Sequence, residues 1–254
     1  MTIDNKIISN LFEFFTFIGQ QTQKLVEAEG YNAINLFGSD WPNRIYHLDK
    51  REINLPVILE LLQKIERNEL PNLLTIPENS ELQKCLEDVG LFQSLTQRGM
   101  TITLNDPLPE PNNNLQQIKR VESKEEAIVY AEIASKGFQY NVDPDIIEVL
   151  RKNPSRVKQF IGKYDNTYAC CGMSFYDSIG NAGLYMIATL PQYRGLGLGR
   201  NITIRLLNEC LKEDIHFCSL QASPAGEPVY TKLGFRPYKN IYTYKMNGEN
   251  VRYK

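Results

Sequence analysis

The chain has 254 residues, a length that favours two modest domains or one large one. Apolar residues make up 42% of the sequence and charged residues 23%, and the mean hydropathy is −0.36. These values exclude a disordered or fibrous protein. No apolar run reaches the roughly 18 to 20 residues of a membrane-spanning helix, and the N-terminal stretch lacks the pattern of a secretory signal. We therefore expect a cytoplasmic protein without a membrane partner.

The two halves of the chain differ in charge. Residues 1–115 carry 9 Lys and Arg against 16 Asp and Glu, a net charge of −7, whereas residues 116–254 carry 19 against 14, a net charge of +5. A moderately basic half can attract a polyanion such as a nucleotide cofactor, but no stripe dense in Lys and Arg indicates a nucleic-acid partner. Three prolines and four asparagines within 105–114 disfavour both helix and sheet. This composition predicts a linker over 107–116, between an N-terminal domain (1–106) and a C-terminal domain (117–254).

Hydrophobic periodicity predicts a small α/β domain in the first half. The segments with a helical pattern are 3–27, 55–67 and 78–88. The short apolar runs typical of strands are 33–37, 44–48, 73–76 and 100–104. Trp41 and Tyr46 belong to its most distinctive stretch, and we interpret them as contacts for a ligand or as core aromatics.

The second half has a more regular mixed α/β pattern. Strands are predicted at 117–121, 157–164, 168–176, 183–190 and 216–222, helices at 124–137, 143–152, 198–212 and 226–233, and a final hairpin at 235–245. Ser123 and Glu126 have the spacing of a helix-capping pair. Turn residues between the three consecutive strands favour antiparallel neighbours. The fold class is therefore a mixed, mostly antiparallel sheet flanked by helices.

The most informative stretch is the glycine-rich turn at 194–200, between an apolar strand and a predicted helix. Gly195, Gly197 and Gly199 let the backbone turn sharply and approach a ligand, and the first N–H groups of the next helix are free donors. Arg194 and Arg200 flank the turn, so a diphosphate suits it. A purely structural turn is the alternative. A P-loop is excluded because Gly199 is not followed by Lys-Ser/Thr, and the glycine spacing does not fit a dinucleotide-binding fingerprint.

The run Arg194-Gly195-Leu196-Gly197-Leu198-Gly199 resembles the acyl-CoA pyrophosphate motif, R/Q-x-x-G-x-G/A, of the GNAT superfamily of N-acetyltransferases. A second motif follows at 228–235, where Tyr230 precedes Gly234-Phe235 as in the late helix of that family. The resemblance covers about 117–254 and implies a GNAT-like sheet in the second half. The first half lacks the glycine-rich turn, and we interpret it as a degenerate GNAT-like half.

The resemblance also implies which residues act. The strand near 185–189 would bulge and separate from the strand at 216–222, and main-chain groups of Ile187, Ala188 and Thr189 would bind pantetheine. The residues expected to bind the pyrophosphate are Arg194, Gly195, Leu196, Gly197, Leu198, Gly199 and Arg200. Tyr230 would be the catalytic acid, because an ordinary phenol with a pKa of about 10 keeps its proton at neutral pH.

The general base stays open, because 183–190 contains no carboxylate. The available groups are Asp143, Glu227 and His216, of which His216 is expected to begin a buried strand. Ser223 stands near a position where many GNAT proteins have a cofactor-binding Asn.

No metal site is expected from two histidines, His47 and His216, without a metal-ligand spacing. The five cysteines have no framework spacing, so we expect reduced and mostly buried thiols. The leading hypothesis is an N-acetyltransferase that uses acetyl-CoA and a small-molecule or peptide amine. The alternative is a non-catalytic acyl-CoA-binding or sensing module that presents a surface to a partner. We expect the choice of amine to depend on segments that include 138–141. The identity of the amine and the oligomeric state, including a homodimer, stay open.

Overall fold

The computed structural model describes residues 1–36, 38–48, 55–109 and 116–246. The first part of the chain forms α1 (Ile3–Gln21), β1 (Leu25–Ala28), β2 (Tyr31–Ile34), β3 (Arg44–Tyr46), α2 (Leu55–Glu66), β4 (Leu74–Pro77), α3 (Ser80–Asp88) and β5 (Leu91–Thr103). The predicted linker at 107–116 falls largely on residues 110–115, which lie outside the described residues.

The second part forms β6 (Gln116–Arg120), α4 (Lys124–Phe138), α5 (Pro144–Arg151), β7 (Val157–Tyr164), β8 (Thr167–Tyr176), β9 (Ala182–Thr189), α6 (Leu198–Lys212), β10 (Phe217–Ala222), α7 (Glu227–Lys232) and β11 (Arg236–Met246). Up to α7, each observed bound lies within one residue of the predicted one. The predicted cap is confirmed, because the Ser123 hydroxyl accepts the N–H of Glu126 at 3.3 Å.

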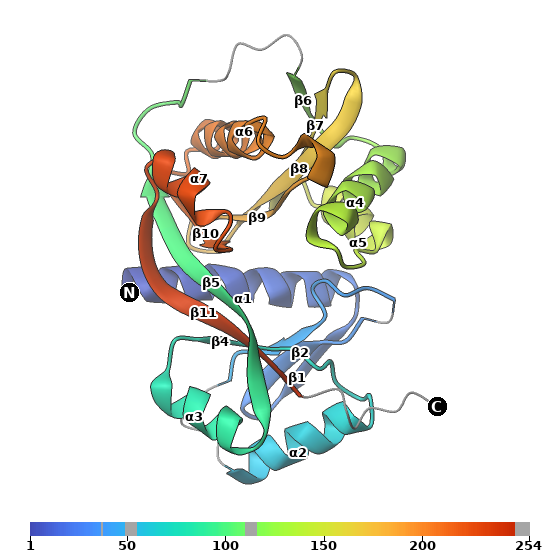
Figure 1. Cartoon of the computed structure of the whole chain (residues 1–254), viewed down its shortest axis with the longest axis vertical. Helices are drawn as coiled ribbons and strands as arrows, with labels where there is room; N and C mark the ends of the chain where they lie inside the picture. The colour runs from blue at the N-terminus through green and yellow to red at the C-terminus, as the bar shows by residue number, and fades with distance from the viewer. Residues whose placement is uncertain (37, 49–54, 110–115, 247–254) are drawn as a thin grey trace.

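The described strands form one eleven-stranded sheet, in the order β1-β2-β3-β4-β11-β5-β10-β9-β8-β7-β6. Most neighbours are antiparallel, and the parallel pairs are β3 with β4 and β9 with β10. The sheet therefore has the mixed, mostly antiparallel character that the sequence predicted. β5 and β11 run side by side from one half of the molecule to the other (Figure 1).

The two halves repeat one order of elements. The series β3-α2-β4-α3-β5 in the first half matches β9-α6-β10-α7-β11 in the second, and the first two strands of each series are parallel neighbours. The last strands are exchanged, because β5 pairs with β10 and β11 pairs with β4. The first half thus has the topology of a reduced copy of the second, and the halves share one sheet.

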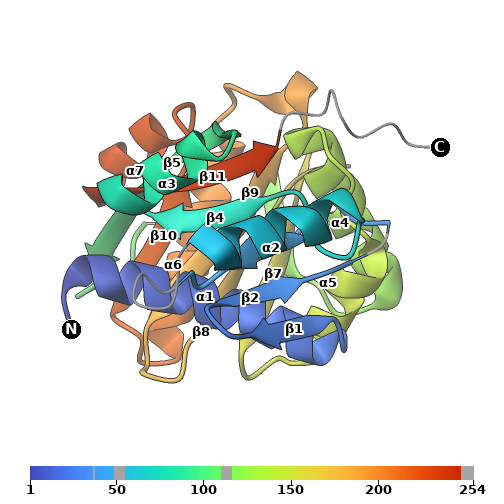
Figure 2. The same cartoon turned by 90° about the horizontal axis from the view of Figure 1, so that it is seen from below.

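Three hydrophobic clusters cover the sheet. α1, α4 and α5 pack on β7, β8 and β9 in one cluster, and α6 packs on the same three strands in another. α2 and α3 contribute the third, over the strands of the first half (Figure 2). The wall between α4 and α6 is therefore the strand pair β8 and β9, which carries the candidate site.

Helix α1 lies across the middle of the molecule and joins the halves (Figure 1). Its buried Asn10 donates to Asp177 at 2.9 Å and accepts the hydroxyl of Tyr185 at 2.6 Å. Glu13 pairs with Arg156 at 2.5 Å. A residue with a Cβ in place of Gly183 would meet the Asn10 amide oxygen at 2.0 Å, so the helix sits directly on β9.

Several sequence predictions were wrong in detail. α1 ends at Gln21 rather than at residue 27, because Gln23 adopts a positive φ of 57° and β1, which was not predicted, begins at Leu25. The C-terminal segment is one long strand, β11, and not a hairpin. β5 begins at Leu91, nine residues before the predicted strand.

Trp41 and Tyr46 belong to the core, since Trp41 packs against Phe14 and Tyr46 against Phe12 and Phe15. Four cysteines are buried, as expected, and Cys85 is exposed. Among the described residues, no helix is both long and apolar enough to cross a membrane.

Candidate functional site

The site begins with a bulge in β9. Cys171 of β8 pairs with Ala188 and Met173 pairs with Tyr185, so Met186 and Ile187 of β9 stand opposite Gly172 alone. Met186 has a positive φ of 53°, which L-residues rarely adopt. Gly172 leaves room for the extra residue, because a Cβ there would lie 3.2 Å from Ile187 Cγ1 and 3.0 Å from Leu206 Cδ1.

At the same level β9 leaves β10. Their parallel pairing runs from Ala182 with Cys218 to Leu184 with Leu220 and stops there, while β10 stays paired with β5 as far as Ala222. The bulge and the separation are those that the GNAT resemblance implied. We call the opening between β9 beyond Leu184 and β10 beyond Leu220 the wedge.

The glycine-rich turn closes one end of the wedge. A short 3₁₀ turn at Pro191–Tyr193 leads into Gly195 and Gly197, whose φ angles of +84° and +77° favour glycine. Neither position has another atom within 4 Å of where a Cβ would stand, so the turn is open to a ligand. Gly197 caps α6 without a side chain, which leaves the first N–H groups of the helix as free donors.

A cavity of about 650 Å³ joins the turn to the wedge. Of the residues that the sequence analysis singled out, the structure brings the following to its wall: Ile187, Ala188, Thr189, Arg194, Gly195, Gly197, Leu198, Gly199, Arg200 and Tyr230. Leu196 is 46% exposed and lies outside the lining. We call this space the wedge cavity.

The charge of the wedge cavity suits an anion. Arg194, Arg200 and Lys232 line it, and no Asp or Glu stands among its described lining residues. The guanidinium of Arg194 also has a partner in the protein. It donates to the Gly137 carbonyl oxygen at 2.6 Å and so links the turn to the end of α4. Together with the macrodipole of α6, these cations make the turn end of the cavity attractive to phosphate groups.

Tyr230 lies on α7 with its ring on the cavity wall. The ring packs edge-on against Phe235 at 5.8 Å between centroids, and a Cβ at Gly226 would lie 3.1 Å from it. Burial raises the pKa of the phenol to about 12, so the hydroxyl keeps its proton at neutral pH. No hydrogen bond of this hydroxyl is found within the part of the chain that the structure describes, which leaves it free to donate.

None of the three candidate bases reaches the wedge cavity. His216 is exposed and not buried as expected, because it precedes β10 at the end away from the wedge. Its ring bonds to the Leu104 carbonyl oxygen at 2.8 Å and to Asp214 at 3.2 Å, and both contacts raise its pKa. Asp143 caps α5. Glu227 begins α7 outside the described lining, and Ser223 does line it.

The sequence analysis missed part of the wall. The missed residues are Gly137, at the end of α4, and Lys232, at the end of α7. Phe138 lines the cavity too, and it belongs to the segment 138–141 that the sequence analysis related to the choice of amine. Phe138 stacks on Tyr140 with centroids 5.3 Å apart. A Cβ at Gly137 would lie 2.9 Å from Ala188 Cβ, so this glycine is what allows α4 to approach β9. In the sequence, the only signal was the breakdown of the helical pattern at Gly137.

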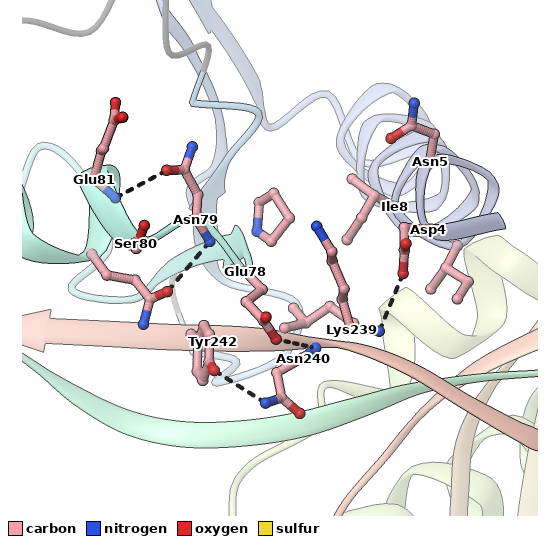
Figure 3. A pocket seen from close by; sticks show the side chains of 14 residues that line it. Asp4, Asn5, Ile8, Glu78, Asn79, Ser80, Glu81, Lys239, Asn240 and Tyr242 are labelled. Atoms are coloured by element: carbon pink, nitrogen blue, oxygen red, sulfur yellow. Dashed lines mark hydrogen bonds between the residues drawn. The ribbon is translucent and has the colours of Figure 1, made fainter. Parts of the chain in front are cut away.

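A second cavity, of about 680 Å³, lies between the start of α1, the β4–α3 turn and β11 (Figure 3). Its polar groups serve the fold: Asp4 accepts the N–H of Lys239 at 3.1 Å, and Glu78 accepts that of Asn240 at 3.0 Å. Asn79 caps α3. No residue of the glycine-rich turn or of the bulge lines it, so the candidate site is the wedge cavity. Within the described residues, no group of three or more His, Cys, Asp or Glu could hold a metal ion.

The part of the chain that forms this site is similar to a known protein domain. Residues 129–247 match the model of the acetyltransferase (GNAT) domain. The match runs from α4 to the end of β11 and contains the bulge, the wedge and the glycine-rich turn. The part of the chain that carries the candidate site is therefore similar to a GNAT domain. No curated protein matches the sequence significantly.

The solved structures extend the likeness to both halves. A GCN5-related N-acetyltransferase from Kribbella flavida aligns with a TM-score of 0.73 and 18% identity over 99% of this chain and 98% of its own. One from Sphaerobacter thermophilus gives 0.62 and 12% over 85% and 76%. A tandem GNAT protein from the clavulanic acid biosynthesis pathway gives 0.59 and 13% over 84% and 77%. At these identities the likeness concerns the fold alone, and one of these neighbours is itself a tandem GNAT protein.

Proposed function

We propose that this chain is an N-acetyltransferase that moves an acetyl group from acetyl-CoA to a primary amine by direct attack of the amine on the thioester. The observation that carries the proposal is the wedge cavity. An uncapped helix N-terminus, three cationic side chains and the open end of β9 face one space of about 650 Å³. This volume is typical of a cofactor-sized ligand.

The residues of the cavity fit the parts of acetyl-CoA in order. The N–H groups of the turn at 195–200 suit the diphosphate, and Arg200 and Lys232 supply positive charge beside it. Beyond Leu184, β9 has lost its neighbour on the β10 side. Main-chain groups of Ile187, Ala188 and Thr189 can therefore pair with the pantetheine amides as an added strand would.

Acetyl-CoA supplies an activated thioester, and the chain supplies orientation and one proton. The amine nitrogen forms a bond to the carbonyl carbon while the carbon–sulfur bond breaks. A donor in the wedge stabilises the charge that develops on the carbonyl oxygen. Tyr230 gives its phenolic proton to the departing sulfur, and the proton that the nitrogen loses restores the phenol through water, so the exchange balances.

Water is the proposed acceptor of the amine proton, because the described lining of the wedge cavity holds no carboxylate. Small-molecule and peptide amines are both compatible with this arrangement.

We also propose that residues 1–106 are a degenerate GNAT-like half, separated at 107–116 from the acetyltransferase half at 117–254. Its role in the function is indirect: β5 supplies the strand beside β10, and Asn10 of α1 holds Tyr185 at the base of the wedge.

The lack of a carboxylate in the lining favours a second candidate, an acyl-CoA-binding or sensing module without catalysis. Both functions predict that acetyl-CoA raises the melting temperature, since a ligand stabilises the state that binds it. Only turnover separates them.

The experiment is thiol release from acetyl-CoA in the presence of a panel of small and peptide amines. We expect release with at least one amine, and a loss of about 10²- to 10⁴-fold in kcat for Tyr230→Phe, the range for a general acid. Tyr46→Phe is the matched control, because its phenol is buried in the first half and bonds to Thr16. Binding without release across the panel would favour the sensing module.

A further inference from the structure

Two buried side chains hold one peptide group at the β9 bulge. The carbonyl oxygen of Met186 accepts the hydroxyl of Tyr130, on α4, at 3.4 Å. It also accepts the thiol of Cys171, on β8, at 3.6 Å. Tyr130 and Cys171 are both fully buried. Two side-chain donors thus meet this carbonyl oxygen at the place where β9 loses its register with β8.

The direction of this carbonyl fixes the direction of the next N–H. In a trans peptide the C=O and the N–H point to opposite sides. The Met186 carbonyl points toward α4 and β8, so the Ile187 N–H of the same peptide points away from β8. The open side of β9 at this level is the wedge, and Ile187 lines the wedge cavity.

We propose that Tyr130 and Cys171 are positioning residues that aim the Ile187 N–H at the thioester carbonyl oxygen of the acyl donor. The inference rests on the proposed function, since it assigns a task to that same site. The N–H is the donor that stabilises the developing oxyanion, and the two side chains keep it in place before the donor arrives.

The surroundings explain why the peptide needs holding. Met186 adopts a left-handed φ of 53°, a conformation that persists only when neighbouring groups enforce it. The Met186 side chain is held as well, because its sulfur accepts the Tyr140 hydroxyl at 3.7 Å. Without the two donors, the buried carbonyl would lose the hydrogen bonds that hold it toward α4 and β8, and the peptide would be freer to rotate.

Both positioning groups keep their protons. Burial raises the pKa of the Tyr130 phenol and of the Cys171 thiol well above their ordinary values. Each therefore remains a hydrogen-bond donor across the neutral range. Burial also keeps both from acting as an acid or a nucleophile, so their contribution is to geometry.

The test uses the full chain and a spectroscopic signal that requires no known amine. Acetyl-CoA labelled with ¹³C at the acetyl carbonyl is bound to the protein, and its carbonyl stretch is measured by isotope-edited infrared difference spectroscopy. The variants are Tyr130→Phe, Cys171→Ala and their combination, with Cys171→Ser as the conservative variant that retains a donor. Tyr46→Phe and Cys210→Ala are the controls, because they remove a buried phenol and a buried thiol far from the bulge.

We expect binding to the wild type to lower the stretching frequency, each single variant to lose part of that shift, and the double variant to lose most of it. Cys171→Ser and the controls should retain it. With any amine that turns over, we expect kcat of the double variant to fall about 100-fold, as for the loss of one oxyanion donor. Calorimetry with coenzyme A, which has no acyl carbonyl, should give affinities within about threefold of the wild type.

An unchanged carbonyl shift in the double variant overturns the inference and leaves the proposed function standing. The absence of any carbonyl shift when the wild type binds acetyl-CoA also overturns the inference and leaves the proposed function standing. If the wild type binds no acetyl-CoA, the proposed function and the inference both fail. If the double variant does not fold, Tyr130→Phe decides alone, because its ring keeps the core filled, and a full shift in that variant overturns the inference.

Discussion

Gly197 offers the sharpest test of the glycine-rich turn. Its φ of +77° is unfavourable for any residue with a Cβ, yet a Cβ there would meet no atom within 4 Å. Gly197→Ala therefore adds no clash and costs only backbone strain, about 1–2 kcal/mol. Gly180 is the matched control, with a φ of +80° and equally open space, in the β8–β9 loop away from the wedge cavity.

The two substitutions should lower the melting temperature alike, by about 2–4 °C for each kcal/mol at this chain length. Their effects on coenzyme A should differ. In the absence of ligand, the Gly197→Ala variant relieves its backbone strain by turning the N–H groups of the turn. Binding of coenzyme A must then restore the strained backbone, and this cost of about 1–2 kcal/mol weakens the affinity about 5- to 30-fold. Calorimetry with coenzyme A measures this difference. Equal affinities for Gly197→Ala and Gly180→Ala would refute the role of the turn.

Three other outcomes follow from the structure. Because burial raises the pKa of Tyr230 to about 12, kcat should stay level between pH 8 and 10, and a decline centred near pH 10 would contradict the assignment. The hydrogen bond to Arg151 is the main cause that lowers the pKa of Glu148 to about 2. The ionised carboxylate therefore stabilises the fold fully above its unfolded pKa near 4.5, and this stabilisation is lost as the pH falls toward 2. Thermal melts of Glu148→Gln should therefore differ from the wild type at pH 7 and converge at pH 2. Asn10→Ala leaves Asp177 and the Tyr185 hydroxyl short of a partner inside the protein, which should cost about 1–3 kcal/mol in urea unfolding, and an unchanged midpoint would argue against this junction.

Local signals explain which parts of the fold could be predicted from the sequence. Ser123 and the cap it forms, like the turn residues between β7, β8 and β9, act on their own neighbours, so the elements from β6 to α7 were predicted within one residue. The exchange of β5 and β11 depends on pairing between residues more than 100 positions apart. Arg98 pairs with Asn240, for example, and nothing in either segment specifies that partner. The hairpin predicted for 235–245 failed for this reason.

The candidate site, too, contains residues that a local sequence signal reveals and residues that it does not. The glycine-rich turn carries its own backbone requirement, so Gly195 and Gly197 could be recognised directly. The bulge at Met186 has no such signal, because an apolar strand residue with a positive φ looks like any other. Gly137 and Lys232 reach the cavity through the packing of α4 and α7, which sequence periodicity does not resolve.

A crystal structure of the chain with acetyl-CoA tests the central claim most directly. We expect the diphosphate oxygens within hydrogen-bond distance of the N–H groups at 195–200, pantetheine between β9 and β10, and the thioester sulfur beside the Tyr230 hydroxyl. A ligand seated elsewhere on the chain, or a wedge that stays empty at saturating acetyl-CoA, would contradict the claim.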